Sequence, residues 1–130
     1  MTKKVYKILL DNKLFGTTKL EFGDPPMGIV FGQINFAENN IGYDFIRQYC
    51  IDNLIEIQTD YPNDKLITTG LIENLKVYSS DNFELVGLGK NIAGMDADSY
   101  TITILGIDGG VYEKEFPEHI VQYEQKFSNE

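Results

Sequence analysis

The feature that most constrains the fold of this chain is a series of short β-type segments separated by turn residues. Residues 4–10 and 14–22 are rich in Val, Ile, Leu, Phe and Thr, and the "DNK" between them is a short turn, so this region predicts a β-hairpin. Residues 29–36 predict a third strand, and residues 54–59 predict another because Ile and Thr alternate with Glu and Gln. Short connections of this kind favour antiparallel neighbours.

The second half of the chain combines an ambiguous segment, a predicted loop and a clear β-pattern. Residues 71–78 fit either a helix or a strand, and the preceding Thr pair and the Val-Tyr end favour the strand. Residues 90–99 predict a loop. Residues 100–116 predict a second hairpin, because Thr and Ile alternate at its start and Asp108-Gly109 is a pair that tight turns prefer.

Two segments have helical periodicity instead. The apolar residues of "YDFIRQYCIDNL" recur at i, i+1, i+4 and i+5, which predicts a helix from about 42 to 53 with Cys50 on its buried face. A short C-terminal helix is predicted after Pro117, because proline is tolerated at a helix start. The expected fold class is therefore α+β, predominantly antiparallel β: a curled or barrel-like sheet with one main helix, in a single domain over 1–130.

The stretch "GDPPMGIVFG" at 23–32 joins two of these strands. A phosphate-binding Walker loop needs Lys and then Ser or Thr after its second glycine, and these are missing, while a strand rather than a helix follows. Two consecutive prolines predict a stiff loop with a turn that ends at Gly28. The loop is either a simple connection that protects a sheet edge or, if Met27 points outward, a contact surface. Its candidate partner-binding residues are Asp24, Pro25, Pro26 and Met27.

The sequence contains no catalytic or metal-binding signature. His119 is its only histidine, and we expect it at the surface or as a helix cap. Asp96 and Asp98 could face a hard cation, but the glycine and closing Glu of an EF-hand calcium loop are missing, so a solvated loop is expected. A lone cysteine allows no internal disulfide and supplies no second thiolate for a metal. The sequence therefore predicts no cofactor, no metal and no enzymatic activity.

Charge is the strongest global signal. The net charge is −9, and it is uneven: residues 1–20 carry five Lys and one Asp, whereas the remainder carries 6 basic and 19 acidic residues. Such a surface repels phosphates, so direct nucleic-acid binding is not expected. The acidic excess either keeps the protein soluble or meets a basic partner. No stretch approaches the roughly 20 apolar residues that cross a bilayer, and no signal-peptide pattern is found, so we expect a cytoplasmic protein without a membrane partner.

In size, acidity and lack of catalytic residues, the chain is similar to the immunity proteins and antitoxins with which bacteria neutralise toxin domains. This similarity of class implies a non-enzymatic module that binds a basic protein partner. Two other classes fit the sequence: a small-molecule-binding or hydrolytic β-rich domain that uses Asp or Tyr in a sheet cavity, and a self-associating structural protein. Further candidates for binding the basic partner, with the tyrosine as aromatic anchor, are Asp96, Asp98, Tyr112, Glu113, Glu115 and Glu118.

Overall fold

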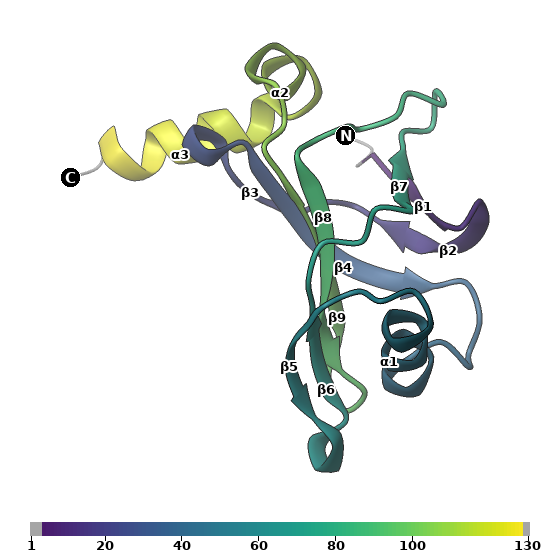
Figure 1. The fold of residues 1–130 in the computed structure, drawn as a ribbon. Coiled ribbons are helices and arrows are strands. Elements are labelled where there is room, and N and C mark those ends of the chain that lie inside the picture. The colour runs from purple at the N-terminus through teal and green to yellow at the C-terminus, as the bar shows by residue number, and fades with distance from the viewer. Residues whose placement is uncertain (1–3, 129–130) are drawn as a thin grey trace.

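The structure is a computed structural model that describes residues 4–128, and these residues form an α+β fold built on a nine-stranded antiparallel sheet with three α-helices (Figure 1). The predicted fold class is therefore confirmed. The elements in chain order are β1 (Tyr6–Leu10), β2 (Lys13–Thr18), β3 (Phe22–Asp24), the 3-10 turn η1 (Pro25–Met27), β4 (Ile29–Phe36), α1 (Tyr43–Asp52), β5 (Ile57–Tyr61), the 3-10 turn η2 (Pro62–Asp64), β6 (Leu66–Thr69), β7 (Leu75–Tyr78), β8 (Gly89–Met95), β9 (Tyr100–Leu105), α2 (Gly109–Glu115) and α3 (Pro117–Ser128).

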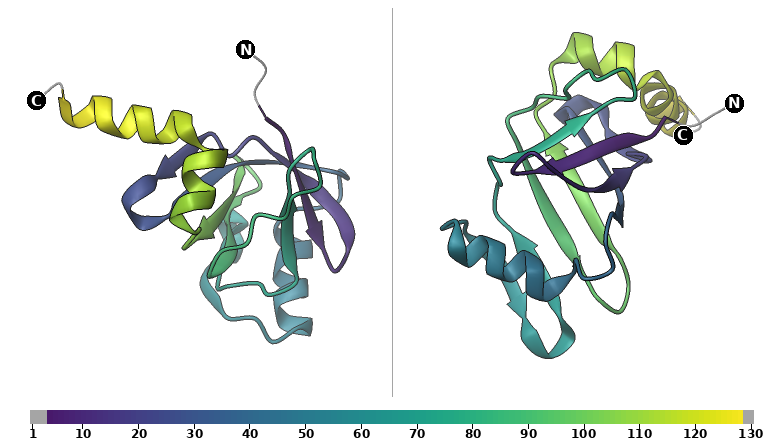
Figure 2. Two further views of the ribbon diagram at one scale, coloured as in Figure 1. Left: turned by 90° about the horizontal axis from the view of Figure 1, so that it is seen from above. Right: turned by 90° about the vertical axis from the view of Figure 1, so that its right-hand side faces the viewer.

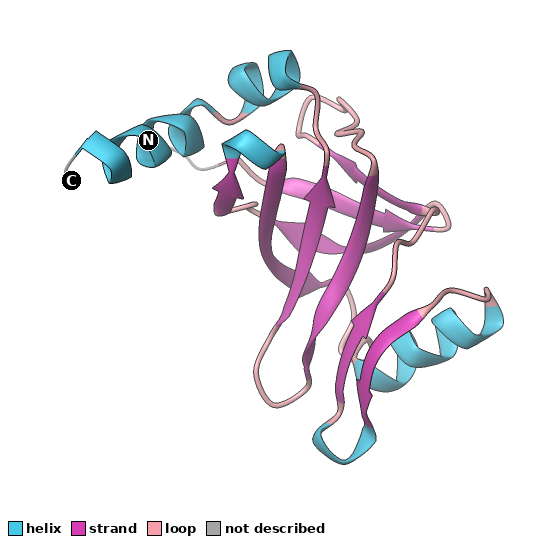
Figure 3. Cartoon of the chain, turned by 60° about the vertical axis from the view of Figure 1, so that its left-hand side comes forward, coloured by secondary structure: helices cyan, strands magenta, loops and turns pink. Residues whose placement is uncertain are grey.

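The sheet is curled and is not closed into a barrel. Its strand order is β5-β6-β8-β9-β4-β2-β1-β7, with β3 paired to β4 beside this path. The curl occurs along β4, because residues 30–33 pair with β9 whereas residues 34–36 pair with β2. As a result β1, β2 and β7 cross over the remaining strands, and α1 lies beside β6 at the other end of the sheet (Figures 1 and 3).

The core lies inside this curl. Alternating apolar residues of the crossing strands and of the central strands are fully buried and belong to one cluster. Removing these side chains from water is the main favourable contribution to folding, so the alternation in the sequence determines which face of each strand points inward. Core residues at no more than 1% exposure include Ile8, Leu75, Val77, Ile92, Ile102 and Ile104.

Several of the predicted elements are confirmed. Asp11 and Asn12 both have positive φ, 51° and 67°, as the tight turn of the first hairpin requires. The helix expected over about 42–53 is α1, and its Cys50 is buried. The ambiguous segment 71–78 contains a strand, β7.

The loop predicted over 90–99 is wrong for most of its length, because residues 89–95 form β8 between β6 and β9. Its backbone groups pair on both sides, although the sequence has little strand propensity. Gly94 is needed there for close approach: an added Cβ would lie 2.6 Å from Cα of Tyr100.

The hairpin predicted over 100–116 is also wrong in its second half. Asp108 has φ −52° and caps α2, since its carboxylate accepts hydrogen bonds from the backbone N–H groups of Gly110 at 3.0 Å and Val111 at 3.2 Å. An Asp in this role favours a helix start rather than a two-residue turn.

The predicted C-terminal helix is confirmed as α3, which contacts β3 and η1 and projects from the body of the protein at its C-terminal end (Figure 2). Phe116, 1% exposed, links both C-terminal helices to the sheet, because its ring centroid lies 5.9 Å from that of Tyr6 and 5.4 Å from that of Tyr112.

The surface position expected for His119 is wrong: its side chain is 4% exposed and stacks on Phe116. Nε2 of His119 donates to the carbonyl oxygen of Leu20 at 2.8 Å.

Candidate functional site

The acidic residues predicted to form one patch lie at two opposite ends of β9. Asp96 and Asp98 belong to the turn between β8 and β9, whereas Glu113, Glu115 and Glu118 lie on α2 and α3, which follow the far end of β9 (Figure 1). The structure therefore does not bring these carboxylates together, and the two ends have to be considered separately.

At the α2–α3 end, two of the predicted contact residues already make hydrogen bonds or ion pairs inside the protein. Tyr112 cannot be an exposed aromatic anchor, because its side chain is 3% exposed and its hydroxyl donates to the carbonyl oxygen of Ile29 at 3.0 Å. Burial, with Asp24 and Glu118 nearby, raises the pKa of Tyr112 to about 12. Glu115 accepts a 2.7 Å hydrogen bond from the hydroxyl of Tyr6 and pairs with Lys4 at 3.4 Å. Glu113 and Glu118 are exposed.

The proline loop lies at this same end and has the geometry that the sequence predicts. The backbone N–H of Gly28 donates to the carbonyl oxygen of Pro25 at 3.0 Å, and Gly28 has φ 65°, so the turn ends at Gly28. Met27 is 64% exposed and points outward. Beside the loop, Phe22 is 56% exposed and stacks on Phe31. The loop with Asp24, Pro25, Pro26 and Met27 therefore stays a candidate contact surface.

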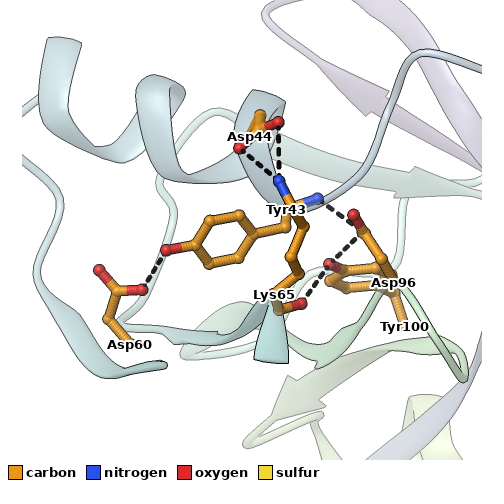
Figure 4. A network of polar contacts seen from close by, with 6 residues as sticks. All are labelled: Tyr43, Asp44, Asp60, Lys65, Asp96 and Tyr100. Atoms are coloured by element: carbon orange, nitrogen blue, oxygen red, sulfur yellow. Dashed lines mark hydrogen bonds and ion pairs between the residues drawn. The ribbon is translucent and has the colours of Figure 1, made fainter. Parts of the chain in front are cut away.

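The opposite end of the sheet carries a denser group of charges, which we call the acidic tip. It is built from the first turn of α1, the β5–η2–β6 hairpin and the β8–β9 turn (Figure 4). It contains five acidic and two basic side chains, and an exposed tyrosine at the end of strand β5. The acidic tip comprises Asp44, Asp60, Asp64, Asp96 and Asp98, together with Arg47, Lys65 and Tyr61.

Asp96 joins the three segments of the acidic tip. Its Oδ1 accepts hydrogen bonds from the backbone N–H of Tyr43 and from the hydroxyl of Tyr100, both at 2.9 Å. It therefore supplies the helix cap that Gly42 lacks, and a Cβ on Gly42 would lie 2.8 Å from that oxygen. The backbone N–H of Asp96 donates to the carbonyl oxygen of Lys65 at 3.1 Å, which ties the turn to the hairpin.

Asp60 is the second fixed carboxylate. It accepts hydrogen bonds from the hydroxyl of Tyr43 and from Nε of Arg47, the latter at 2.9 Å. These bonds hold the pKa of Asp60 below its ordinary value, so the group is a carboxylate at neutral pH. Because the pKa is lowered on folding, the stabilising contribution of Asp60 is present above about pH 4 and is lost as the pH falls further.

The remaining charges of the acidic tip are more open. Nζ of Lys65 lies 3.3 Å from a carboxylate oxygen of Asp44 and 5.6 Å from the ring centroid of Tyr43. Asp64 and Asp98 are exposed, and within residues 4–128 their side chains make no hydrogen bond or ion pair. Tyr61 is 57% exposed at the end of the hairpin. In the acidic tip, hydrogen bonds of Asp60 and Asp96 thus fix the backbone segments relative to one another, while free carboxylates and one aromatic ring are exposed to solvent.

The chemical groups of the acidic tip are mainly carboxylates, some fixed by hydrogen bonds and some open to solvent. In the part of the chain that the structure describes, no three His, Cys, Asp or Glu side chains are placed to hold a metal ion. The carboxylates of the acidic tip are paired with tyrosine, arginine, lysine or backbone donors, or face solvent. Fixed acidic groups of this kind recognise a positively charged surface.

Comparisons with known proteins add no assignment. No protein-family model matches the chain, and neither a curated protein nor a solved structure is significantly similar to it. Within residues 4–128, no helix is both long and apolar enough to cross a membrane.

Sequence reasoning identified Asp96 and Asp98 but missed the residues that hold them. Tyr43 and Tyr100 have the ordinary pattern of core residues, and both are 4% exposed. Asp60 follows a strand pattern without any distinguishing motif. The signal that could have drawn attention to this end was the number of Asp residues in three separate turns and helix starts, which only the fold brings together.

Proposed function

We propose that this protein is a non-enzymatic, cytoplasmic protein-binding module whose acidic tip binds a basic surface of a protein partner. The observation that carries the proposal is the network in which Tyr43, Asp60 and Asp96 hold the segments of the acidic tip together while other carboxylates stay free. A surface whose segments are already fixed by intramolecular hydrogen bonds loses little conformational entropy on binding. Free carboxylates steer a basic partner toward it.

The partner class that fits best is a basic toxin domain, for instance of the nuclease type, whose active site the acidic tip would occlude. An inhibitor of this kind needs no chemistry of its own, and a net charge of −9 speeds its encounter with a basic target. The exposed ring of Tyr61 is the aromatic group at the acidic tip that can enter a pocket of the partner. This role corresponds to that of an immunity protein.

Affinity capture with two charge variants tests the proposal. Asp64→Lys/Asp98→Lys reverses two free charges of the acidic tip, and Glu113→Lys/Glu124→Lys makes the same charge change on α2 and α3 as a matched control. All four side chains are exposed and, among the described residues, unpaired. The wild type and the control should retain from an extract of the source cells one basic protein, identified by mass spectrometry, that the tip variant loses.

Two outcomes of the capture experiment would contradict the proposal. If the wild type retains no basic protein, the acidic tip does not bind the expected class of partner. If the partner is lost with the Glu113→Lys/Glu124→Lys variant and kept with the tip variant, the contact surface is the α2–α3 end with its exposed proline loop.

A further inference from the structure

A lysine occupies a core position of β8. Lys90 lies opposite Ile104 of β9 and on the same face as Ile92, which is 1% exposed. The Lys90 side chain is itself only 7% exposed, and it is the buried lysine among those of residues 4–128. Lysine side chains are rarely buried to this extent unless they are paired.

Among the described residues, the ammonium group of Lys90 has no such partner. Within residues 4–128, its Nζ makes no hydrogen bond and no ion pair. Burial lowers the pKa of Lys90, and the positive charge of Lys76 acts in the same direction, while Glu84 partly opposes both. The neutral amine, which is the nucleophilic form, is therefore more abundant at Lys90 than at an exposed lysine.

Lys90 lines an open depression of about 340 Å³ between β7 and the segment 84–89 that leads into β8. Polar and apolar groups contribute to the wall in similar measure, and three of its apolar side chains are unusually exposed: Leu71 at 54%, Val86 at 62% and Leu88 at 86%. An apolar molecule that covered these side chains would remove them from water. The volume suits a small molecule.

The charges of the depression decide which class of small molecule fits. Lys76 and Lys90 face the depression together with Glu73 and Glu84, so the site has no net positive charge that would attract an anion. An uncharged ligand avoids repulsion by both carboxylates. A carbonyl group is the uncharged function that a partly neutral amine can attack.

We propose that this depression binds a small apolar aldehyde or ketone and that Nζ of Lys90 forms an imine with it. The lone pair of the neutral amine attacks the carbonyl carbon and forms the C–N bond. The two protons of the amine pass to the carbonyl oxygen, which leaves as water, and Glu84, which also lines the depression, is the carboxylate that relays them through solvent. The step is reversible and needs neither oxidant nor reductant. It is independent of the acidic tip.

Reductive trapping tests the inference with all lysines of the protein as internal references. The full chain is incubated at neutral pH with benzaldehyde and sodium cyanoborohydride, which reduces an imine to a stable amine, and labelled sites are mapped by peptide mass spectrometry. Lys90 should be labelled severalfold faster than the exposed lysines, because its lowered pKa leaves a larger fraction of the neutral amine. In Lys90→Arg, the fast phase should disappear.

Two matched variants separate a bound aldehyde from a merely reactive amine. Leu88→Asp changes the wall of the depression, and Leu54→Asp makes the same change at a residue that is 94% exposed elsewhere. Leu88→Asp should slow the labelling of Lys90 severalfold and leave other lysines unaffected, and Leu54→Asp should change nothing. Labelling of Lys90 at the rate of the exposed lysines, or equal rates in the two variants, would overturn the inference.

Discussion

The variant Asp64→Lys/Asp98→Lys should associate with the basic partner about 10- to 100-fold more slowly than the wild type at low salt. Both carboxylates are exposed and unpaired within the described part of the chain, so their reversal changes the field of the acidic tip without removing a contact that holds the fold. Stopped-flow measurements at ionic strengths of about 0.01 M and about 1 M check this, because the Debye length falls from about 30 Å to about 3 Å between them. The difference between wild type and variant should largely vanish at high salt.

The control for this measurement is Glu113→Lys/Glu124→Lys, which changes the net charge equally at the α2–α3 end. If the acidic tip makes the contact, the control should slow association much less than the tip variant, because its charges lie at the opposite end of the sheet. Equal slowing by both variants would mean that only total charge matters and that the acidic tip has no particular role.

Phe116→Ala should destabilise the protein by about 3–5 kcal/mol, the range for truncating a fully buried phenylalanine. The ring is 1% exposed and contacts Tyr6 on β1, Tyr112 on α2 and His119 on α3, so its loss opens a cavity where both C-terminal helices meet the sheet. Urea unfolding with linear extrapolation measures the change in the free energy of unfolding.

Phe127→Ala is the matched control for Phe116→Ala. Phe127 lies on the projecting part of α3, is 50% exposed and packs against Tyr123. Its truncation should cost less than about 1 kcal/mol, as for other partly exposed sites. Similar values for the two variants would show that Phe116 does not dock the C-terminal helices.

Sequence patterns were sufficient where local chemistry and the final fold agree. The turn residues Asp11 and Asn12 suit the conformation that a tight hairpin needs, and the periodicity around Cys50 is that of the helix formed. The proline loop was predictable for the same reason, since two fixed φ angles leave few alternatives before Gly28.

The missed elements are those that depend on neighbours. Residues 89–95 form a strand because they are paired on both sides, which no local pattern reports. Asp108-Gly109 is compatible with a hairpin and with a helix cap. The four-residue spacing of Tyr112 and Phe116, which are both buried, is the signal in the sequence that favours the helix.

The candidate site was predictable only in part. Asp96 and Asp98 stood out as a pair of acidic residues in a turn. However, Asp96 accepts its hydrogen bond from Tyr43, which is 53 positions away in the sequence, and the hydrogen bond between Tyr43 and Asp60 spans 17 positions. Lys90 carried no signal, because a lysine in a segment predicted to be a loop is expected in solvent, and its burial follows from the place of β8 between β6 and β9.

The central claim is that the acidic tip is the surface that meets the partner, and mapping of amide chemical shifts tests it most directly. Isotope-labelled protein is titrated with the captured basic partner, and perturbed backbone amides are placed on the structure. The account expects the largest changes in residues 60–65 and 95–99 and in the first turn of α1. Changes concentrated instead in β3, η1 and α3, with the acidic tip unaffected, would contradict it.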